Sequence, residues 1–428
     1  MVQPTPKNEI SLEIDGLVYG PGGIGRHEGR AVIVSGAAPG DRVVARIRDM
    51  HRRYATAELL QVLRPSPERQ APPCPYFAQC GGCPWQHVRY RAQLDAKQKC
   101  VEEALRRIGK LTAFEVRPIL ASPREYHYRR RVRLALADDG RIGFRRARSR
   151  ALVEIDSCLI AAEPVNGVLE ALRAWARDIR TEAEELEVVA GDGPDELVAV
   201  LRRSAPFHRP DAAAEALLRR EPRLRGLVAT GGGTRRAWGE TRVSLAPEPG
   251  VDLRVEADVF TQVNPEGNRV LVRELLDAAE PGPADRVLEL YSGAGNFTLP
   301  IARRAGEVVA VEGSRVAMES ARHNAQRGGL ANIRWMEARV PDAVESLSRR
   351  GERFAKIVLD PPRAGAKEIQ ESIASLGAAR IVYVSCDPAT LARDLAALAR
   401  RGYRLERVQP IDLFPHTFHV EAVALLAR

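Results

Sequence analysis

Two polar residues near the C-terminal end of the sequence each follow an apolar run. One residue, Ser385, separates Cys386 from the apolar run Ile381–Val384, and Asp360 directly follows the run Ile357–Leu359. A short apolar run that ends in a proline turn predicts a fully buried strand, and open α/β sheets bind ligands beyond the carboxyl ends of their strands. We therefore predict that Cys386 is a nucleophile in a crevice shared with Asp360. The alternative is the buried structural role that lone cysteines usually have.

A glycine loop that suits a nucleotide-like cofactor precedes these residues. Residues 286–290 predict a strand, and Ser292–Phe297 has the pattern G-x-G-N where a helix begins. A second predicted strand ends in Glu312, at the distance where an acid holds ribose hydroxyls. The third glycine of a dinucleotide loop, which packs the helix beneath a pyrophosphate, is missing. S-adenosylmethionine therefore fits better than a nicotinamide dinucleotide, with Glu312 at the ribose and the loop at the methionine end.

Three of the six cysteines are grouped as C-x5-C-x2-C at Cys74, Cys80 and Cys83. In a reducing compartment this clustering predicts a metal site. A fourth thiolate is required, and we choose Cys158, which follows a predicted strand, over Cys100, which lies within a helical pattern. Four thiolates suit an iron–sulfur cluster or a zinc ion. Free surface cysteines are the remaining alternative.

The elements that position these residues predict three domains and an α/β fold class. Residues 1–63 contain short β-like runs between glycine turns such as Gly20–Gly25, which predicts a small, OB-like β-barrel. Residues 64–264 mix helices with antiparallel strands and predict a central α+β domain. In residues 265–428 strands and helices alternate, which predicts a Rossmann-like, doubly wound parallel sheet.

The net charge of +9, carried mainly by arginine, predicts a polyanionic partner. Arg codon preference in a GC-rich genome would produce the same balance. Two runs, Tyr126–Arg133 and Phe144–Arg150, interleave Arg with aromatic residues, a pattern that pairs with phosphates and stacks on unpaired bases; a solvated sheet face is the alternative. We expect RNA as the partner, with no obligate protein partner. Since no apolar run approaches the ~20 residues of a membrane span, we expect a cytoplasmic location.

Five motifs together resemble the RNA (uracil-5-)-methyltransferases, specifically the branch with an iron–sulfur cluster and an N-terminal TRAM domain, for which residues 10–63 are the match. The motifs are Phe260–Asn264 (FTQVN), Tyr291–Asn296 (YSGAGN), Asp360–Gly365 (DPPRAG), Ser385–Thr390 (SCDPAT) and Leu413–Glu421 (LFPHTFHVE). The resemblance covers nearly the whole chain. It implies an S-adenosylmethionine site formed by Gln262, Tyr291, Asn296, Glu312 and Asp360. It also implies a [4Fe-4S] cluster bound by Cys74, Cys80, Cys83 and Cys158.

The reaction that this resemblance implies is methylation of carbon 5 of a uridine in RNA. Cys386 adds to carbon 6 of the ring, and Glu421 removes the proton from carbon 5. Asp360 contacts either the uracil edge or the cofactor amine. The branch favours 23S ribosomal RNA, with transfer RNA as the alternative; an inactive RNA-binding or ribosome-assembly factor is the alternative from another class. Phe418 and Asp387 depart from the smaller residue and the Asn that are common in the family, and neither change removes a reacting group.

Three other enzyme classes fit less well. Radical enzymes that cleave S-adenosylmethionine usually have the spacing C-x3-C-x2-C, whereas the first gap here has five residues. RNA cytosine-5 methyltransferases generally have a second cysteine beside a proline, and the Asp360 motif has none. Amino-methyltransferases have an aromatic residue after two prolines, where Arg363 stands here.

Overall fold

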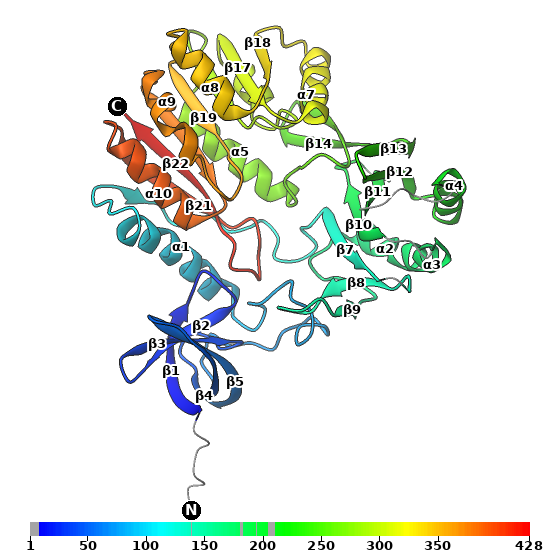
Figure 1. Cartoon of the computed structure of the whole chain (residues 1–428), viewed down its shortest axis with the longest axis vertical. Helices are drawn as coiled ribbons and strands as arrows, with labels where there is room; N and C mark the ends of the chain where they lie inside the picture. The colour runs from blue at the N-terminus through cyan, green and yellow to red at the C-terminus, as the bar shows by residue number, and fades with distance from the viewer. Residues whose placement is uncertain (1–7, 138, 180–182, 194, 204–209) are drawn as a thin grey trace, which may run out of the picture.

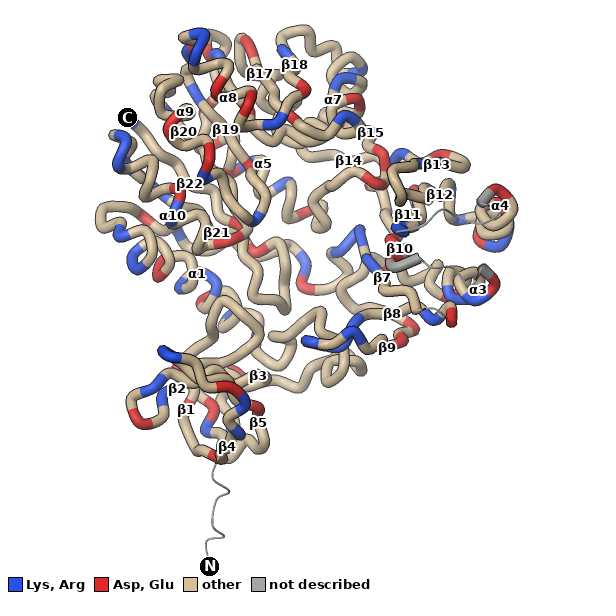
Figure 2. The backbone as a smooth tube through the Cα atoms, in the orientation of Figure 1, with Lys and Arg blue, Asp and Glu red and all other residues tan. Residues whose placement is uncertain are grey.

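The structure, a computed structural model, describes residues 8–137, 139–179, 183–193, 195–203 and 210–428. Figure 1 shows a small barrel at the N-terminal end, a central sheet with helices on its outer side, and a larger C-terminal sheet between layers of helices. Lys and Arg residues occur in all three parts, interleaved with Asp and Glu (Figure 2). Within the described ranges, no helix has the length and apolar character needed to cross a membrane.

The N-terminal barrel has five strands in the order β1-β2-β3-β5-β4, and it closes because β4 also pairs with β1. The strands are β1 (Glu9–Leu17), β2 (Gly22–His27), β3 (Arg30–Ser35), β4 (Arg42–Met50) and β5 (Tyr54–Arg64). The barrel prediction is confirmed, but part of the predicted Gly20–Gly25 turn is strand β2. The reason is close backbone approach: a Cβ atom on Gly25 would lie 2.0 Å from the Glu13 carbonyl oxygen, so glycine is required within the strand.

The central sheet has the order β13-β12-β11-β10-β7-β8-β9. Its strands are β7 (Arg131–Leu136), β8 (Ile142–Arg145), β9 (Leu152–Glu154), β10 (Ala183–Ala190), β11 (Leu197–Arg203), β12 (Leu224–Gly231) and β13 (Thr234–Gly239). One face packs against α2 (Glu163–Gly167), α3 (Leu169–Ile179) and α4 (Pro210–Arg220). The other face packs against the hairpin of β14 (Arg242–Glu248) and β15 (Val251–Glu256), whose apolar side chains also contact Ala294 and Leu299 near the glycine loop. The hairpin therefore joins the central sheet to the predicted cofactor region.

The C-terminal sheet has the order β18-β17-β16-β19-β20-β22-β21-β6. Its strands are β6 (Glu115–Val116), β16 (Arg286–Leu290), β17 (Glu307–Glu312), β18 (Ile333–Glu337), β19 (Lys356–Leu359), β20 (Arg380–Ser385), β21 (Arg404–Ile411) and β22 (Glu421–Ala427). The five strands from β18 to β20 are parallel, as predicted, whereas β22 is antiparallel to both β20 and β21. Only residues 412–420 connect β21 to β22, and a parallel crossover needs a dozen residues or more.

Helices cover both faces of this sheet. The helices are α1 (Tyr90–Arg107), α5 (Pro265–Ala279), α6 (Thr298–Ala302), α7 (Arg315–Arg327), α8 (Val340–Arg349), α9 (Gln370–Ser375) and α10 (Pro388–Ala399), with a 3-10 turn at Lys367–Ile369. Helix α1 packs against α10, and β6 pairs with β21. Residues 90–116, predicted as part of the central domain, therefore join the C-terminal layers, because an amphipathic helix carries no local signal for which apolar sheet it covers.

Candidate active site

Cys386 and Glu421 lie close together where β20 ends and β22 begins in the C-terminal sheet. Strands β20 and β22 are antiparallel and pair Ser385 with Ala422. Continuing this register by one residue beyond the end of β20 places Cys386 opposite Glu421, and the Glu421 carboxylate is close enough to raise the pKa of the Cys386 thiol. Residues directly opposite in an antiparallel pair point to the same face, with Cβ atoms about 4.5–5.5 Å apart. The structure therefore brings the predicted nucleophile and the predicted base together.

The electrostatics of this pair reflect burial and a shared crevice. Glu421 is 4% exposed, and its burial, followed by the nearby Asp360 carboxyl, raises its pKa well above the usual range. Burial, followed by the Glu421 carboxylate, raises the pKa of the Cys386 thiol to about 11. The Arg363 guanidinium opposes both shifts. Ionisation of either group therefore makes ionisation of the other harder, and Arg363 is the cation that offsets this repulsion.

Asp360 directly follows β19, which pairs with β20, so Asp360 and Cys386 leave the sheet from adjacent parallel strands. Burial raises the pKa of the Asp360 carboxyl to about 7. The turn after it is held by Asp394 of α10, whose buried carboxylate accepts hydrogen bonds from the Ala366 amide and the Tyr383 hydroxyl, both at 2.7 Å. These bonds fix the path of the turn that carries Arg363.

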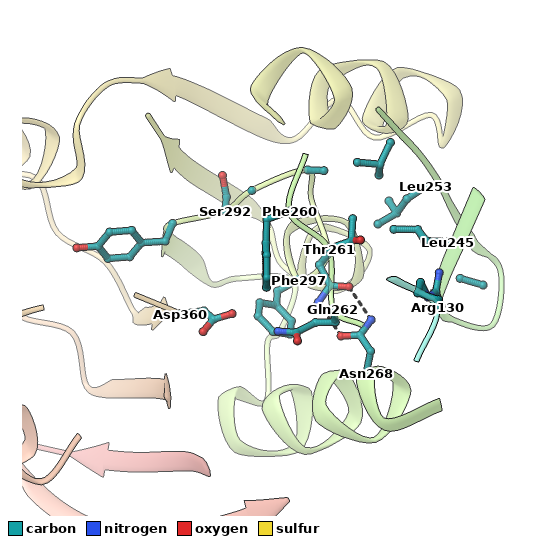
Figure 3. Close-up of a pocket in the computed structure, with 16 residues that line it drawn as sticks. Arg130, Leu245, Leu253, Phe260, Thr261, Gln262, Asn268, Ser292, Phe297 and Asp360 are labelled. Carbon is teal, nitrogen blue, oxygen red and sulfur yellow. Dashed lines mark hydrogen bonds between the residues drawn. The ribbon is translucent and has the colours of Figure 1, made fainter. Parts of the chain in front are cut away.

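Four of the five predicted cofactor residues line one pocket, namely Gln262, Tyr291, Asn296 and Asp360. Figure 3 shows Asp360 at one end of it and Arg130 and Leu253 at the other. Tyr291 has a φ of 63°, a left-handed backbone that is strained for a non-glycine residue. The turn that begins there wraps around the pocket.

The fifth predicted cofactor residue, Glu312, reaches the same loop from the end of β17. One carboxylate oxygen accepts a hydrogen bond of 2.9 Å from the Gly293 amide, and the other accepts one of 2.6 Å from the Ser314 amide. On the opposite side, Asn268 of α5 and Asn296 exchange two side-chain hydrogen bonds of 2.8 and 3.0 Å. The glycine loop is thus held from two sides. Sequence analysis missed Asn268, because the residues around it indicate only an ordinary helix position.

The four predicted metal ligands also come together. Cys74, Cys80, Cys83 and Cys158 line one pocket whose other walls are largely aromatic and aliphatic. Cys100 lies elsewhere, on α1 in a groove beside the barrel. Among the described residues, no group of three or more His, Cys, Asp or Glu side chains has the arrangement of a metal-ion site.

The predicted RNA-binding role of the run Tyr126–Arg133 is wrong for two of its arginines. Arg130 and Arg131 are buried, at 5% and 7% exposure. Arg130 pairs with Asp192 at 2.7 Å, and Arg131 donates to the backbone carbonyls of Ala257 and Val259. The alternation of the sequence did not reveal this, because the acid and carbonyl partners come from distant elements. Arg131 thereby ties the central sheet to the segment that leads into the cofactor pocket, whereas Arg130 makes its ion pair within the central region.

The barrel contributes a side chain to the active site that sequence analysis missed. Tyr19, between β1 and β2, donates a hydrogen bond of 2.9 Å to the Cys386 carbonyl oxygen. Phe418, one of the two departures from the family pattern, packs edge-on against Tyr19 with ring centroids 5.5 Å apart. The other departure, Asp387, accepts hydrogen bonds from two backbone amides at the start of α10, a capping role that Asp and Asn perform equally well.

Comparison with known proteins identifies the family. Residues 249–428 match a family model described as tRNA (Uracil-5-)-methyltransferase, and residues 8–60 match the TRAM domain. The chain is 36% identical to the 23S rRNA (uracil(1939)-C(5))-methyltransferase RlmD of Aeromonas hydrophila, over 99% of this chain and 97% of that relative. The chain belongs to the RNA (uracil-5-)-methyltransferases. The predicted family and TRAM barrel are thereby confirmed.

Other members of the RNA (uracil-5-)-methyltransferases match over a similar length. The RlmD enzyme of Alkalilimnicola ehrlichii is 38% identical over 99% of this chain and 97% of its own. The crystal structure of Pyrococcus abyssi tRNA (uracil-54, C5)-methyltransferase in complex with S-adenosyl-L-homocysteine superposes with a TM-score of 0.75. It is 25% identical and covers 98% of this chain and 100% of that one. The arrangement of barrel, central sheet and methyltransferase sheet is therefore shared with a solved relative.

Proposed function

We propose that this protein methylates carbon 5 of one uridine in 23S ribosomal RNA, with S-adenosylmethionine as the methyl donor. The observation that carries the proposal is that Cys386 and Glu421 lie close to each other and to Asp360, which lines the cofactor pocket. The target RNA is proposed from the full-length relatives, whose names specify 23S rRNA. We also propose that the enzyme acts in the cytoplasm.

The chemistry assigned to this pair follows from the uracil ring. Carbon 5 is a poor nucleophile until a thiolate adds to carbon 6, and Cys386 supplies that thiolate. S-adenosylmethionine, when bound, would supply an electrophilic methyl group for carbon 5, and the break of the methyl–sulfur bond would release S-adenosylhomocysteine. Glu421 then removes the proton from carbon 5, the electron pair of that bond forms the ring double bond, and the bond from carbon 6 to sulfur breaks. The Cys386 thiolate is thereby regenerated.

Binding of the cofactor is assigned to the loop and its neighbours. Glu312, at the end of β17, suits the ribose hydroxyls, while Gln262 and Asn296 line the pocket and suit the methionine end. Tyr291 and Asp360 also line the pocket, and the Asp360 carboxyl is close enough to the catalytic pair to raise the pKa of both Glu421 and Cys386. The pocket contains both polar groups and apolar walls, as a ligand with a ribose, a charged tail and a base requires.

We further propose that Cys74, Cys80, Cys83 and Cys158 hold a [4Fe-4S] cluster. Four thiols around one largely apolar pocket match the ligand set of such clusters. When bound, the cluster would cross-link residues 74–83 to the loop after β9. Anaerobic purification should give a brown protein with about four iron atoms per chain, and Cys158→Ser should lose iron. A colourless protein with one zinc ion would exclude the cluster.

Incubation with 5-fluorouracil-substituted 23S rRNA fragments and S-adenosylmethionine tests the reaction. Fluorine cannot leave as a proton, so a covalent RNA–protein complex should survive denaturing electrophoresis and disappear with Cys386→Ala. A complex that persists in this variant would place the nucleophile elsewhere.

Transfer RNA is the second candidate substrate, and the solved Pyrococcus relative, a tRNA enzyme by its title, is the observation that favours it. Mapping of 5-methyluridine in both RNAs from a strain that lacks the gene distinguishes the two. Loss of the modification from 23S rRNA alone supports the proposal. Loss from tRNA alone would replace it, and loss from neither would favour the inactive RNA-binding factor.

A further inference from the structure

A buried ion pair joins helix α1 to the loop that leads into Glu421. Lys97 of α1 lies 2.6 Å from an Asp412 carboxylate oxygen, and both side chains are completely buried. Lys97 also donates a hydrogen bond of 2.9 Å to the Phe414 carbonyl oxygen. The second Asp412 oxygen accepts a hydrogen bond of 2.9 Å from the Tyr90 hydroxyl. The start of the loop at residues 412–420 is therefore fixed by a helix more than 300 residues away in the sequence.

The same face of α1 holds the middle of this loop. Gln93 accepts a hydrogen bond of 2.8 Å from the His416 amide, and its side-chain nitrogen lies 3.2 Å from the His416 ring. The Trp85 amide donates to the His416 carbonyl oxygen at 3.0 Å. Since Tyr90, Gln93 and Lys97 are spaced at i, i+3 and i+7, they form one polar stripe on the helix.

The loop needs such support for a geometric reason. It is irregular, and His416 within it has a φ of 66°, a strained left-handed conformation. Two buried charges are costly to desolvate, and well-packed apolar residues often give equal or greater stability. A fixed position for the loop is the advantage that an apolar replacement would not provide.

We propose that Lys97 and Asp412 are positioning residues that hold Glu421 in line with the proton on carbon 5. This inference rests on the proposed function. The affected step is the second half of the reaction, in which Glu421 takes the proton and the bond from carbon 6 to the Cys386 sulfur breaks. The pair has no contact with Cys386 in the described structure, so the first half, attack by the thiolate, is expected to proceed.

The test compares the two halves of the reaction. Lys97→Met leaves Asp412 buried and unpaired, which is strongly destabilising, so the principal variant is the double replacement Lys97→Met/Asp412→Leu, which removes both charges. We expect this variant to form the covalent complex with 5-fluorouracil RNA at close to the normal rate. With ordinary uracil RNA, release should slow by up to about 10²-fold, the effect of a misplacement of about 1 Å, and the covalent complex should accumulate.

The controls separate positioning from general damage. Lys99→Met, an exposed lysine two residues along the same helix, should not accumulate complex. Tyr90→Phe removes one hydrogen bond to Asp412 and should give a smaller shift in the same direction, which keeps the inference testable if the double variant does not fold. Equal slowing of both halves of the reaction, or normal release, would overturn the inference.

Glu421→Gln provides the reference point. If Glu421→Gln accumulates the complex and neither the double variant nor Tyr90→Phe does, this inference fails and the proposed function stands. If Glu421→Gln itself releases RNA normally, the proposed function fails first.

Discussion

Replacement of Glu421 by Gln removes the proposed base while the size of the side chain is kept. Glu421 is the first residue of β22 and is 4% exposed. Burial raises the pKa of its carboxyl well above the usual range, which means that the ionised form is costly in this crevice. A neutral amide avoids that cost. We therefore expect the variant to fold at least as stably as the natural protein.

The expected magnitude follows from the role of Glu421 in one step. A positioned general base contributes about 10²–10⁴ in rate, which corresponds to about 3–5 kcal/mol of activation free energy. In the proposed reaction, attack by Cys386 and methyl transfer both precede this step and do not use the base. The slow step is therefore release, and a methylated RNA–protein complex should build up toward one RNA per protein with ordinary uracil RNA.

Denaturing electrophoresis with methyl-labelled S-adenosylmethionine measures this complex directly. The label should migrate with the protein in Glu421→Gln and should be absent when Cys386→Ala is added to the same chain. Turnover close to that of the natural protein would refute the reasoning. So would loss of methylation without any complex, because it would place Glu421 in an earlier step.

Three further predictions concern the barrel and the crevice. Tyr19→Phe removes the 2.9 Å hydrogen bond to the Cys386 carbonyl oxygen. Because such a bond is worth about 0.5–1.5 kcal/mol, covalent complex formation with 5-fluorouracil RNA should slow about 2- to 10-fold. An unchanged rate would contradict a role for Tyr19 in positioning Cys386. Burial raises the pKa of Asp360 to about 7. The protonated carboxyl therefore adds to the free energy of unfolding in full below about pH 4, and this contribution is lost as the pH rises through 7. Asp360→Asn should therefore raise the melting temperature relative to the natural protein at pH 8 but not at pH 4, and equal differences at both would be inconsistent with the shift. Gly25→Ala places a methyl group 2.0 Å from a β1 carbonyl oxygen. Thermal unfolding should show that this variant is destabilised by about 1–3 kcal/mol. Gly16→Ala is the control and should not be destabilised, because a Cβ atom at Gly16 has no neighbour within 4 Å.

Many features of the site could be predicted because they depend on short segments. An apolar run followed by a proline turn is enough to place Cys386 and Asp360 at strand exits. The glycine loop and the acid at Glu312 follow from spacing along one strand–turn–helix unit. The close grouping of Cys74, Cys80 and Cys83 is likewise local.

Other features depend on contacts between distant segments. The direction of β22 is one, because an alternating doubly wound pattern predicts a parallel strand, whereas the short connection from β21 requires an antiparallel one. The burial of Arg130 is another, since its partner Asp192 belongs to a separate part of the central region. Lys97 has the sequence environment of an ordinary helical lysine, and the carboxylate of Asp412 that makes its burial tolerable is 315 positions away.

The amino-acid sequence by itself thus determined the candidate reacting groups, the type of cofactor that is expected and the strand ends that carry these groups, because periodicity and turn chemistry act over a few residues. Tertiary structure decided that the sulfur and the carboxylate meet. Their meeting depends on the register of β20 with β22, and a shift of one residue would turn every side chain of a strand to the opposite face. That register is fixed by packing on both sides of the sheet and by contacts from α1 to the loop before Glu421, and the α1 residues that make these contacts lie far from Cys386 and Glu421 in the sequence.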